Sequence, residues 1–193
     1  MKTINSRTTE YPIDNVFLKR YSPRAMSGET ITKEELMTLF EAGRWAPSSN
    51  NSQPWRFVYA QRETTSFENL LSFLTEHNKT WCQNASTLIV VISKNNFDNG
   101  NPSKTHSLNT GMAFENLALQ ATEMGLISHG MEGFDYTLAK EKLEVSDDYS
   151  VEMMIAIGKL GNIEDLPEIL REREKPSSRK NLEEIVFEGN FKN

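Results

Sequence analysis

Two arginines near the start of the sequence could bind a phosphate group together. They lie in the stretch Arg20-Tyr21-Ser22-Pro23-Arg24. Because proline disfavours the helical conformation of the residue before it, this stretch should be extended, and alternate side chains then share one face. Arg20, Ser22 and Arg24 would point together, and two guanidinium groups with a hydroxyl between them suit a phosphate. The alternative is a solvated basic stretch that leaves a helix.

A polar loop between two prolines is the second candidate ligand site. The stretch APSSNNSQPW spans residues 46–55, and its small polar side chains offer many hydrogen-bond donors and acceptors. The prolines restrict the conformations of the loop before binding. This composition suits a polar heteroaromatic ligand, and the alternative is an ordinary solvated turn.

The third candidate is the glycine-containing stretch GMEGFD, residues 130–135. Glycines at 130 and 133 permit close backbone approach to a flat ligand, and free N–H groups there could bond to a ring nitrogen. The alternative is a glycine turn into a helix from Tyr136, with Asp135 as its N-cap. The two interpretations are compatible.

Composition and missing motifs exclude several classes of function. The 193 residues carry 21 Lys and Arg against 27 Asp and Glu, a net charge of −6, which argues against broad binding of nucleic acid. One cysteine and three scattered histidines offer neither a disulfide nor the spacing of a metal site. GxGxxG, GxxxxGK[ST], GxSxG and HExxH are absent, so the usual dinucleotide, ATP, hydrolase and zinc-protease sites lose support.

The sequence predicts neither a membrane span nor export. It has no run of about 18 apolar residues. Its start, MKTINSRTTE, lacks the charged-then-apolar pattern of a secretory signal. We therefore expect a cytoplasmic protein without a membrane partner.

Helices and strands intermix along the chain. Thr32 and Glu35 form a capping-box pattern that predicts a helix over 32–45. Strands are predicted over 55–59, 87–92 and 151–157, the last closed by Gly158. Further helices are expected over 67–76, 103–124 and 136–143, and the second of these is the central core helix, with Leu108 and Met112 among its apolar residues.

The chain shows no linker and no repeat, so a single domain over residues 1–193 is expected, with residues 1–11 flexible. A strongly charged tail, residues 165–180, precedes the apolar segment Glu184–Phe187. That segment lies too far from the other core elements to need a place in its own subunit. It could pair with the sheet edge of a partner chain.

Together, the three motifs resemble those of the nitroreductase family of oxidoreductases, which depend on flavin mononucleotide (FMN). The resemblance covers residues 12–187, and the stretch from Pro47 to Trp55 is its most specific part. It implies an α+β fold, an antiparallel-rich sheet flanked by helices, and a homodimer with FMN at the interface. The C-terminal extension, residues 163–193, would pack on the partner subunit and exchange its apolar end into the partner's sheet.

The resemblance also implies roles for individual residues in binding FMN. The contacts to the flavin phosphate and ribityl chain from one subunit would be Arg20, Tyr21, Ser22 and Arg24. The wall contributed by the other subunit would be Pro47, Ser48, Ser49 and Asn51. Asn78 would bond to the pyrimidine end of the ring, and the turn Met131-Glu132-Gly133 would bring backbone N–H groups to flavin N5. Arg179 would be a second phosphate-binding arginine, or else one more charge in a charged tail.

Three positions depart from the family pattern. Trp81 stands where many relatives place a lysine or arginine near flavin N1 and O2, and a positive charge there would favour the anionic reduced flavin. Arg24 or another cation could substitute for it. Gly130 stands where some relatives carry proline, and Ser177 where some carry a second basic residue.

The resemblance implies an enzyme whose difficult chemistry belongs to the cofactor, with no metal and no catalytic side chain identified. In the implied ping-pong cycle, NADH or NADPH gives a hydride to flavin N5 and leaves, and an electron-poor small molecule, a nitroaromatic or a quinone, then accepts the electrons. Phe114, His129 and Trp81 could line the acceptor cavity or pack in the core. His129 could donate a proton or bond locally.

Two other functions stay open at this point. One is a flavin-dependent reductase of another electrophile, such as an enone or a halophenol. The other is a flavin-binding sensor without turnover. The acceptor that reoxidises the reduced protein would distinguish the first, and failure of both nicotinamides to reduce it would favour the second.

Overall fold

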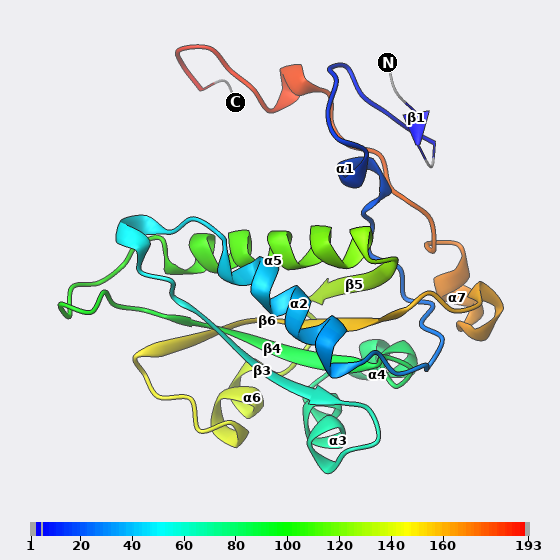
Figure 1. Cartoon of the computed structure of the whole chain (residues 1–193), viewed down its shortest axis with the longest axis horizontal. Coiled ribbons are helices and arrows are strands. Elements are labelled where there is room, and N and C mark those ends of the chain that lie inside the picture. Colours follow the sequence, from blue (N-terminus) through cyan, green and yellow to red (C-terminus); the bar gives the residue numbers. More distant parts are fainter. Residues whose placement is uncertain (1–2, 5, 192–193) are drawn as a thin grey trace.

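The computed structural model describes residues 3–4 and 6–191, in which a four-stranded sheet lies between two layers of helices (Figure 1). The strand order is β3 (Trp55–Gln61), β4 (Thr87–Lys94), β6 (Tyr149–Lys159) and β5 (Leu126–Met131). Every neighbouring pair in this sheet is antiparallel. The predicted α+β class, with an antiparallel-rich sheet flanked by helices, is confirmed.

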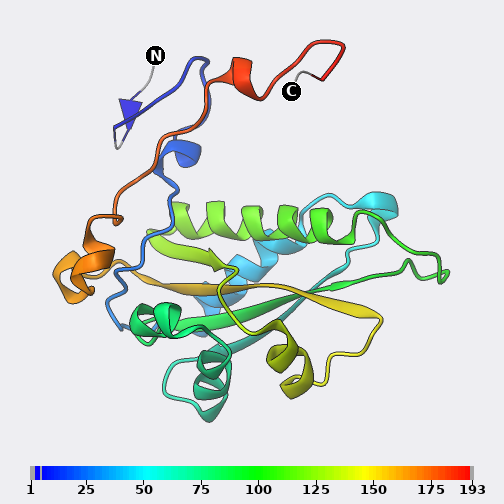
Figure 2. The ribbon, with the colours of Figure 1, turned by 180° about the vertical axis from the view of Figure 1, so that it is seen from behind.

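The central strand β4 shows why both faces of the sheet are covered. Its residues Leu88, Val90 and Ile92 lie in one core with α3 (Thr65–Ser72), α4 (Glu76–Cys82) and α6 (Tyr136–Lys142). Ile89 and Val91 lie in a second core with α2 (Lys33–Arg44) and α5 (His106–Glu123). Because successive side chains of a strand face opposite sides, a continuous apolar run needs apolar partners on both. Figure 2 shows the two helical layers from behind.

Helix α2 begins where the capping box predicts. Thr32 Oγ1 accepts a hydrogen bond from the Glu35 N–H (3.1 Å), and Glu35 Oε2 accepts one from the Thr32 N–H (2.7 Å). The helix ends at Arg44, with Trp45 as its C-cap. The polar loop therefore follows α2 directly and leads into β3.

The predicted helix over 67–76 is wrong in its second part. Helix α3 ends at Ser72 and α4 starts at Glu76. Between them, Leu74 bridges to Phe134, and the Thr75 N–H donates to the Gly133 carbonyl (3.1 Å). These long-range contacts interrupt the helix and bring α4 to the glycine turn.

Strand β5 was not predicted, and β6 is longer than predicted. The sequence LISHGM of β5 shows no clear alternation, and it forms a strand because it pairs with Lys159–Met154 of β6. Gly158 lies inside β6 rather than closing it. The turn that follows β5 therefore starts from a fixed sheet edge.

Helix α5 forms as predicted but exposes two residues that were expected in the core. Leu108 is 61% exposed, and Met112 also faces outward. The buried side of α5 consists mainly of small residues, Ala113, Ala118 and Ala121, around Leu117. Within residues 3–4 and 6–191, no helix is long and apolar enough to cross a membrane.

The two terminal segments leave the body side by side (Figures 1 and 2). The N-terminal segment comprises the hairpin of β1 (Thr3–Ile4) and β2 (Arg7–Thr8), followed by α1 (Asn15–Lys19). The C-terminal segment, which we call the C-terminal arm, runs from residue 172 to 191 and contains η3 (Leu182–Glu184). The flexibility expected for residues 1–11 stays a prediction.

The first part of the predicted C-terminal extension packs on its own chain. It contains η2 (Ile163–Asp165) and α7 (Glu168–Arg171), and Leu166 and Leu170 are buried in the core of the body. Further on, Glu184–Phe187 forms no strand within this chain, and Ile185 and Val186 are exposed. Pairing of this segment with a partner subunit stays a prediction.

The position of Gly161 gives a first test of the fold. Its N–H donates to the Ala25 carbonyl (2.8 Å), and a Cβ at Gly161 would lie 2.6 Å from the Met26 carbonyl carbon. A backbone atom cannot move aside as easily as the end of a side chain. We therefore expect Gly161→Ala to lower the free energy of unfolding by about 1–3 kcal/mol. The neighbouring Leu160 is 55% exposed, so Leu160→Ala should cost less than about 0.5 kcal/mol. Denaturant unfolding of both variants checks this, and equal losses would contradict it.

Candidate functional site

The predicted anion-binding stretch, Arg20 to Arg24, is extended but belongs to no regular strand. Its backbone is held by groups from distant parts of the chain. Glu174 Oε1 accepts from the N–H groups of Arg24 (2.5 Å) and Ala25 (2.8 Å), and His129 Nδ1 lies 3.2 Å from the Pro23 carbonyl. Because backbone polar groups need partners, these contacts fix the shape of the stretch.

The two arginines of this stretch have different surroundings. Arg20 Nη1 donates to Ser22 Oγ (3.3 Å), as expected for side chains on one face. Arg24 Nη1 lies 3.9 Å from Oε2 of Glu174, whose side chain is 4% exposed. Glu174 therefore offsets the charge of Arg24. Between the two arginines, burial and, secondarily, Glu174 raise the pKa of Tyr21.

Arg20 and Arg179 of the C-terminal arm both lie near Arg7, which donates to the carbonyls of Arg20 and Ser177, and Arg179 donates to the Ser177 hydroxyl. Burial lowers the pKa of Arg7 first, and the positive charges of Arg179 and then Arg20 lower it further. We call Arg7, Arg20 and Arg179 the arginine cluster. None of them forms an ion pair with a carboxylate of residues 3–4 or 6–191. A cluster of this kind suits a bound anion.

Asn78 and Gly133 are in contact. This is expected if both residues bind the ring of the same ligand. Asn78 Nδ2 donates to the Gly133 carbonyl (3.0 Å), and a Cβ at position 133 would lie only 2.6 Å from this nitrogen. The N–H groups of Glu132 and Gly133 donate to no acceptor in the described part of the chain. Asp135 also caps α6 by accepting from the Leu138 N–H (2.9 Å). The turn thus starts a helix and presents two free donors.

The side chains of Met131 and Trp81 pack in the core. Met131 Sδ lies 3.3 Å from Cys82 Sγ, so only its backbone can face a ligand. Trp81 is 1% exposed, and its Nε1 has no partner among the described residues. A buried indole therefore fills the position that is basic in many relatives. Phe114 is only partly buried and packs against the second core, on the α2 and α5 side of the sheet.

His129 connects residues Arg20 to Arg24, which we call the arginine stretch, to α4. Its ring lies 4.7 Å from that of Trp81, and because a carbonyl can only accept, Nδ1 carries the hydrogen in the contact to Pro23. Burial and, next, the positive charge of Arg24 lower the pKa of His129 to about 4. The imidazole is therefore neutral at pH 7. These contacts favour the local-bonding role over proton donation.

The polar loop lies away from the arginine cluster. Figures 1 and 2 place η1 (Ser49–Asn51) at one end of α5 and the stretch after α1 at the other. One chain therefore does not bring Pro47, Ser48, Ser49 and Asn51 to its own arginine cluster.

The backbone of the polar loop is strained. Asn50 and Asn51 (φ 53° for both) and Gln53 (φ 46°) adopt left-handed backbone, which is uncommon for residues with a side chain. Ser48 Oγ holds the loop by accepting from the Gln53 N–H (3.0 Å). Such strain occurs often in ligand-binding loops.

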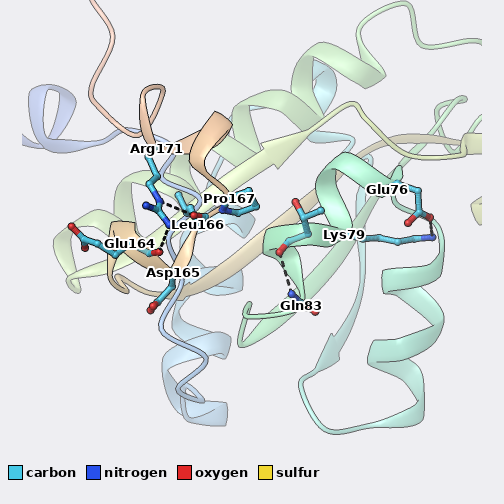
Figure 3. A pocket seen from close by; sticks show the side chains of 9 residues that line it. Glu76, Lys79, Gln83, Glu164, Asp165, Leu166, Pro167 and Arg171 are labelled. Atoms are coloured by element: carbon cyan, nitrogen blue, oxygen red, sulfur yellow. Dashed lines mark hydrogen bonds and ion pairs between the residues drawn. The ribbon is translucent and has the colours of Figure 1, made fainter.

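A hollow of about 640 Å³ lies elsewhere, between α4 and the turn that contains α7 (Figure 3). Lys79 pairs there with Glu76, and Arg171 donates to the carbonyls of Leu166 and Glu164. None of the residues predicted to bind the cofactor lines this hollow. In the described ranges, no group of three or more His, Cys, Asp or Glu residues could hold a metal ion.

Sequence reasoning missed Arg7 and Glu174. Both act on the backbone around Arg20 and Arg24, and Glu174 is 150 residues away from Arg24 in sequence. Glu174 is one of several acidic residues in a charged tail, and Arg7 stands in an ordinary polar stretch. No local pattern could have identified either residue.

Comparison with known proteins identifies related chains. The model of the Nitroreductase family matches residues 18–80 and 59–159. A solved oxidoreductase described as containing FMN is 43% identical, with 100% of this chain and 99% of that chain covered and a TM-score of 0.96. A nitroreductase family protein from Clostridium difficile 630 is 23% identical, with 92% and 98% covered and a TM-score of 0.71. An oxygen-insensitive NADPH nitroreductase from Helicobacter acinonychis is 38% identical over 64 residues, 33% of this chain and 30% of that protein.

The depressed pKa of His129 predicts how stability depends on pH. The value in the folded chain is about 4, against 6.5 for an ordinary histidine, so between these pH values only the unfolded chain takes up the proton. Acidification from about pH 6.5 to 4 should therefore cost the wild type about 2–3 kcal/mol more than the variant His129→Asn. The asparagine amide can still donate to Pro23 but does not titrate. Denaturant unfolding across this range measures the difference, and parallel pH profiles would contradict it.

Proposed function

Because this chain belongs to the nitroreductase family, we propose that it is an FMN-dependent enzyme that transfers a hydride from NADH or NADPH through flavin N5 to an electron-poor acceptor. The observation that carries the proposal is the pair of free N–H groups at Glu132 and Gly133, beside Asn78. When bound, FMN supplies the redox chemistry, and the chain binds and orients it.

We assign the phosphate end of the site to Arg20, Ser22 and Arg179. Arg20 and Arg179 have no carboxylate partner among the described residues, so a phosphate would pair with two positive charges that the chain itself does not neutralise. Arg24 has Glu174 beside it and contributes less net charge. Tyr21 is half-buried beside Arg20 and lines the same stretch.

The ring end of the site would be formed by α4 and the turn after β5. Asn78 would face the pyrimidine end, and the Glu132 and Gly133 N–H groups would approach N5. Gly133 fits this role because a side chain there would displace the Asn78 amide, whose nitrogen lies 2.6 Å from the position of a Cβ. The contribution of Met131 is limited to its backbone, since its side chain lies in the core.

The remaining wall, Pro47, Ser48, Ser49 and Asn51, would come from the second subunit of a homodimer. Its distance from the arginine cluster along α5 supports this division (Figures 1 and 2). Next to the loop, Trp45 is 72% exposed, and Leu108 and Met112 also face outward. The apolar residues of the C-terminal arm, Ile185 and Val186, would pack on the partner in the same assembly.

Nitroaromatics and quinones are the proposed acceptors, and both are electron-poor molecules that can accept a hydride. The nicotinamide donor fits a cytoplasmic location. The printed name of the Helicobacter relative, an NADPH nitroreductase, supports a phosphorylated nicotinamide as one candidate donor.

The visible spectrum of the purified protein without oxygen tests the proposal. We expect flavin bands near roughly 370 and 450 nm that bleach when NADH or NADPH is added and return with a quinone or nitroaromatic. Bands that persist with both nucleotides would favour a sensor. A colourless protein that takes up no added FMN would overturn the proposed function.

A further inference from the structure

Arg7 joins three backbone segments at the phosphate end of the proposed site. Its Nη1 donates to the carbonyls of Leu18 (3.1 Å) and Arg20 (2.6 Å), and its Nε donates to the Ser177 carbonyl (2.9 Å). The residue is only 9% exposed. One guanidinium group thus fixes the end of α1, the start of the arginine stretch and the C-terminal arm relative to one another.

This junction lies where the terminal segments run side by side (Figures 1 and 2). Arg7 is part of the hairpin formed by β1 and β2. Beyond the junction, the Leu182 N–H approaches Glu10 Oε1 at 3.4 Å. The contacts of Arg7 are shorter, and they reach the carbonyl of Arg20 itself. Arg7 therefore couples the arm to the start of the arginine stretch, and Glu174 of the arm bonds to the other end of that stretch, at Arg24.

The contacts of Arg7 also determine where two other charges lie. Ser177 is two residues before Arg179, and Arg179 Nη1 bonds to the Ser177 hydroxyl (3.1 Å) and the Ser178 carbonyl (3.0 Å). Holding the Ser177 carbonyl therefore restricts the position of the Arg179 side chain. Three guanidinium groups repel one another, and this arrangement becomes favourable when an anion binds between them.

We propose that Arg7 is a positioning residue for the FMN phosphate, because it holds the backbone at Arg20 and Ser177 so that Arg20 and Arg179 face the same phosphate. This inference rests on the proposed function and extends it to the N-terminal hairpin. A residue with this role affects only ligands that carry the phosphate. A residue that merely stabilises the fold would affect all flavins alike.

The test compares FMN with riboflavin, which has the same ring and ribityl chain but no phosphate. Dissociation constants of both are measured by flavin fluorescence on the full-length protein after its flavin has been removed. We expect Arg7→Met to weaken FMN binding about tenfold and riboflavin binding less than about twofold. Arg7→Lys should weaken FMN binding severalfold as well, because one ammonium cannot reach all three carbonyls. If Arg7→Met does not fold, Arg7→Lys provides the test.

Arg171→Met is the matched control. Arg171 also donates to two backbone carbonyls of the C-terminal region, at Leu166 and Glu164, but it is not part of the arginine cluster. We expect this variant to bind both flavins as the wild type does.

Two results would overturn the role of Arg7, namely equal weakening of FMN and riboflavin, or unchanged FMN binding in both Arg7 variants. A wild-type protein that binds neither flavin would instead overturn the proposed function. The two failures are therefore distinguishable.

Discussion

The extended segment from Arg20 to Ser27 is the constraint on which the site depends. It lies outside the sheet, so its backbone groups must find partners elsewhere. Those partners include Arg7, His129, Lys159, Gly161 and Glu174, which come from both ends of the chain and from the sheet. The arginines of this segment are therefore held in place only when the whole domain is folded. Glu174 accepts a hydrogen bond from the Arg24 N–H and pairs with the Arg24 guanidinium group. Arg20 has no carboxylate partner among the described residues, so it is available to bind an anion.

The second constraint is that one chain carries its ligand-binding elements at opposite ends of α5 (Figure 1). The arginine cluster lies toward the end of α5, where β5 begins, whereas the strained loop over Ser49–Asn51 lies beside the start of α5. A homodimer would join the two, and we expect it also to cover Trp45, Leu108 and Met112, which a single chain leaves in solvent. The strain of the loop, the exposure of Leu108 and the open arginine cluster then have a common explanation.

Much of this arrangement could be predicted from local sequence patterns. The helix after Thr32, the buried run of β4 and the cap at Asp135 follow from capping chemistry and apolar periodicity, and the structure confirms them. Strand β5, the break between α3 and α4, and the roles of Arg7 and Glu174 were missed, because each depends on a partner far away in sequence. Trp81 shows the same limit. Sequence identified it as a departure from the family, but only the fold shows that the indole is fully buried.

A mixed dimer tests directly whether each flavin site combines residues of two chains, as we propose. One chain carries Arg20→Glu with Arg179→Glu, the other carries Ser49→Trp, and the two are co-expressed with different tags and purified together. If the site is shared, one of the two sites in the mixed dimer keeps all its native residues. We therefore expect about half the flavin content of the wild type in the mixed dimer, and almost none in either parent. A mixed dimer as empty as its parents would contradict the shared site.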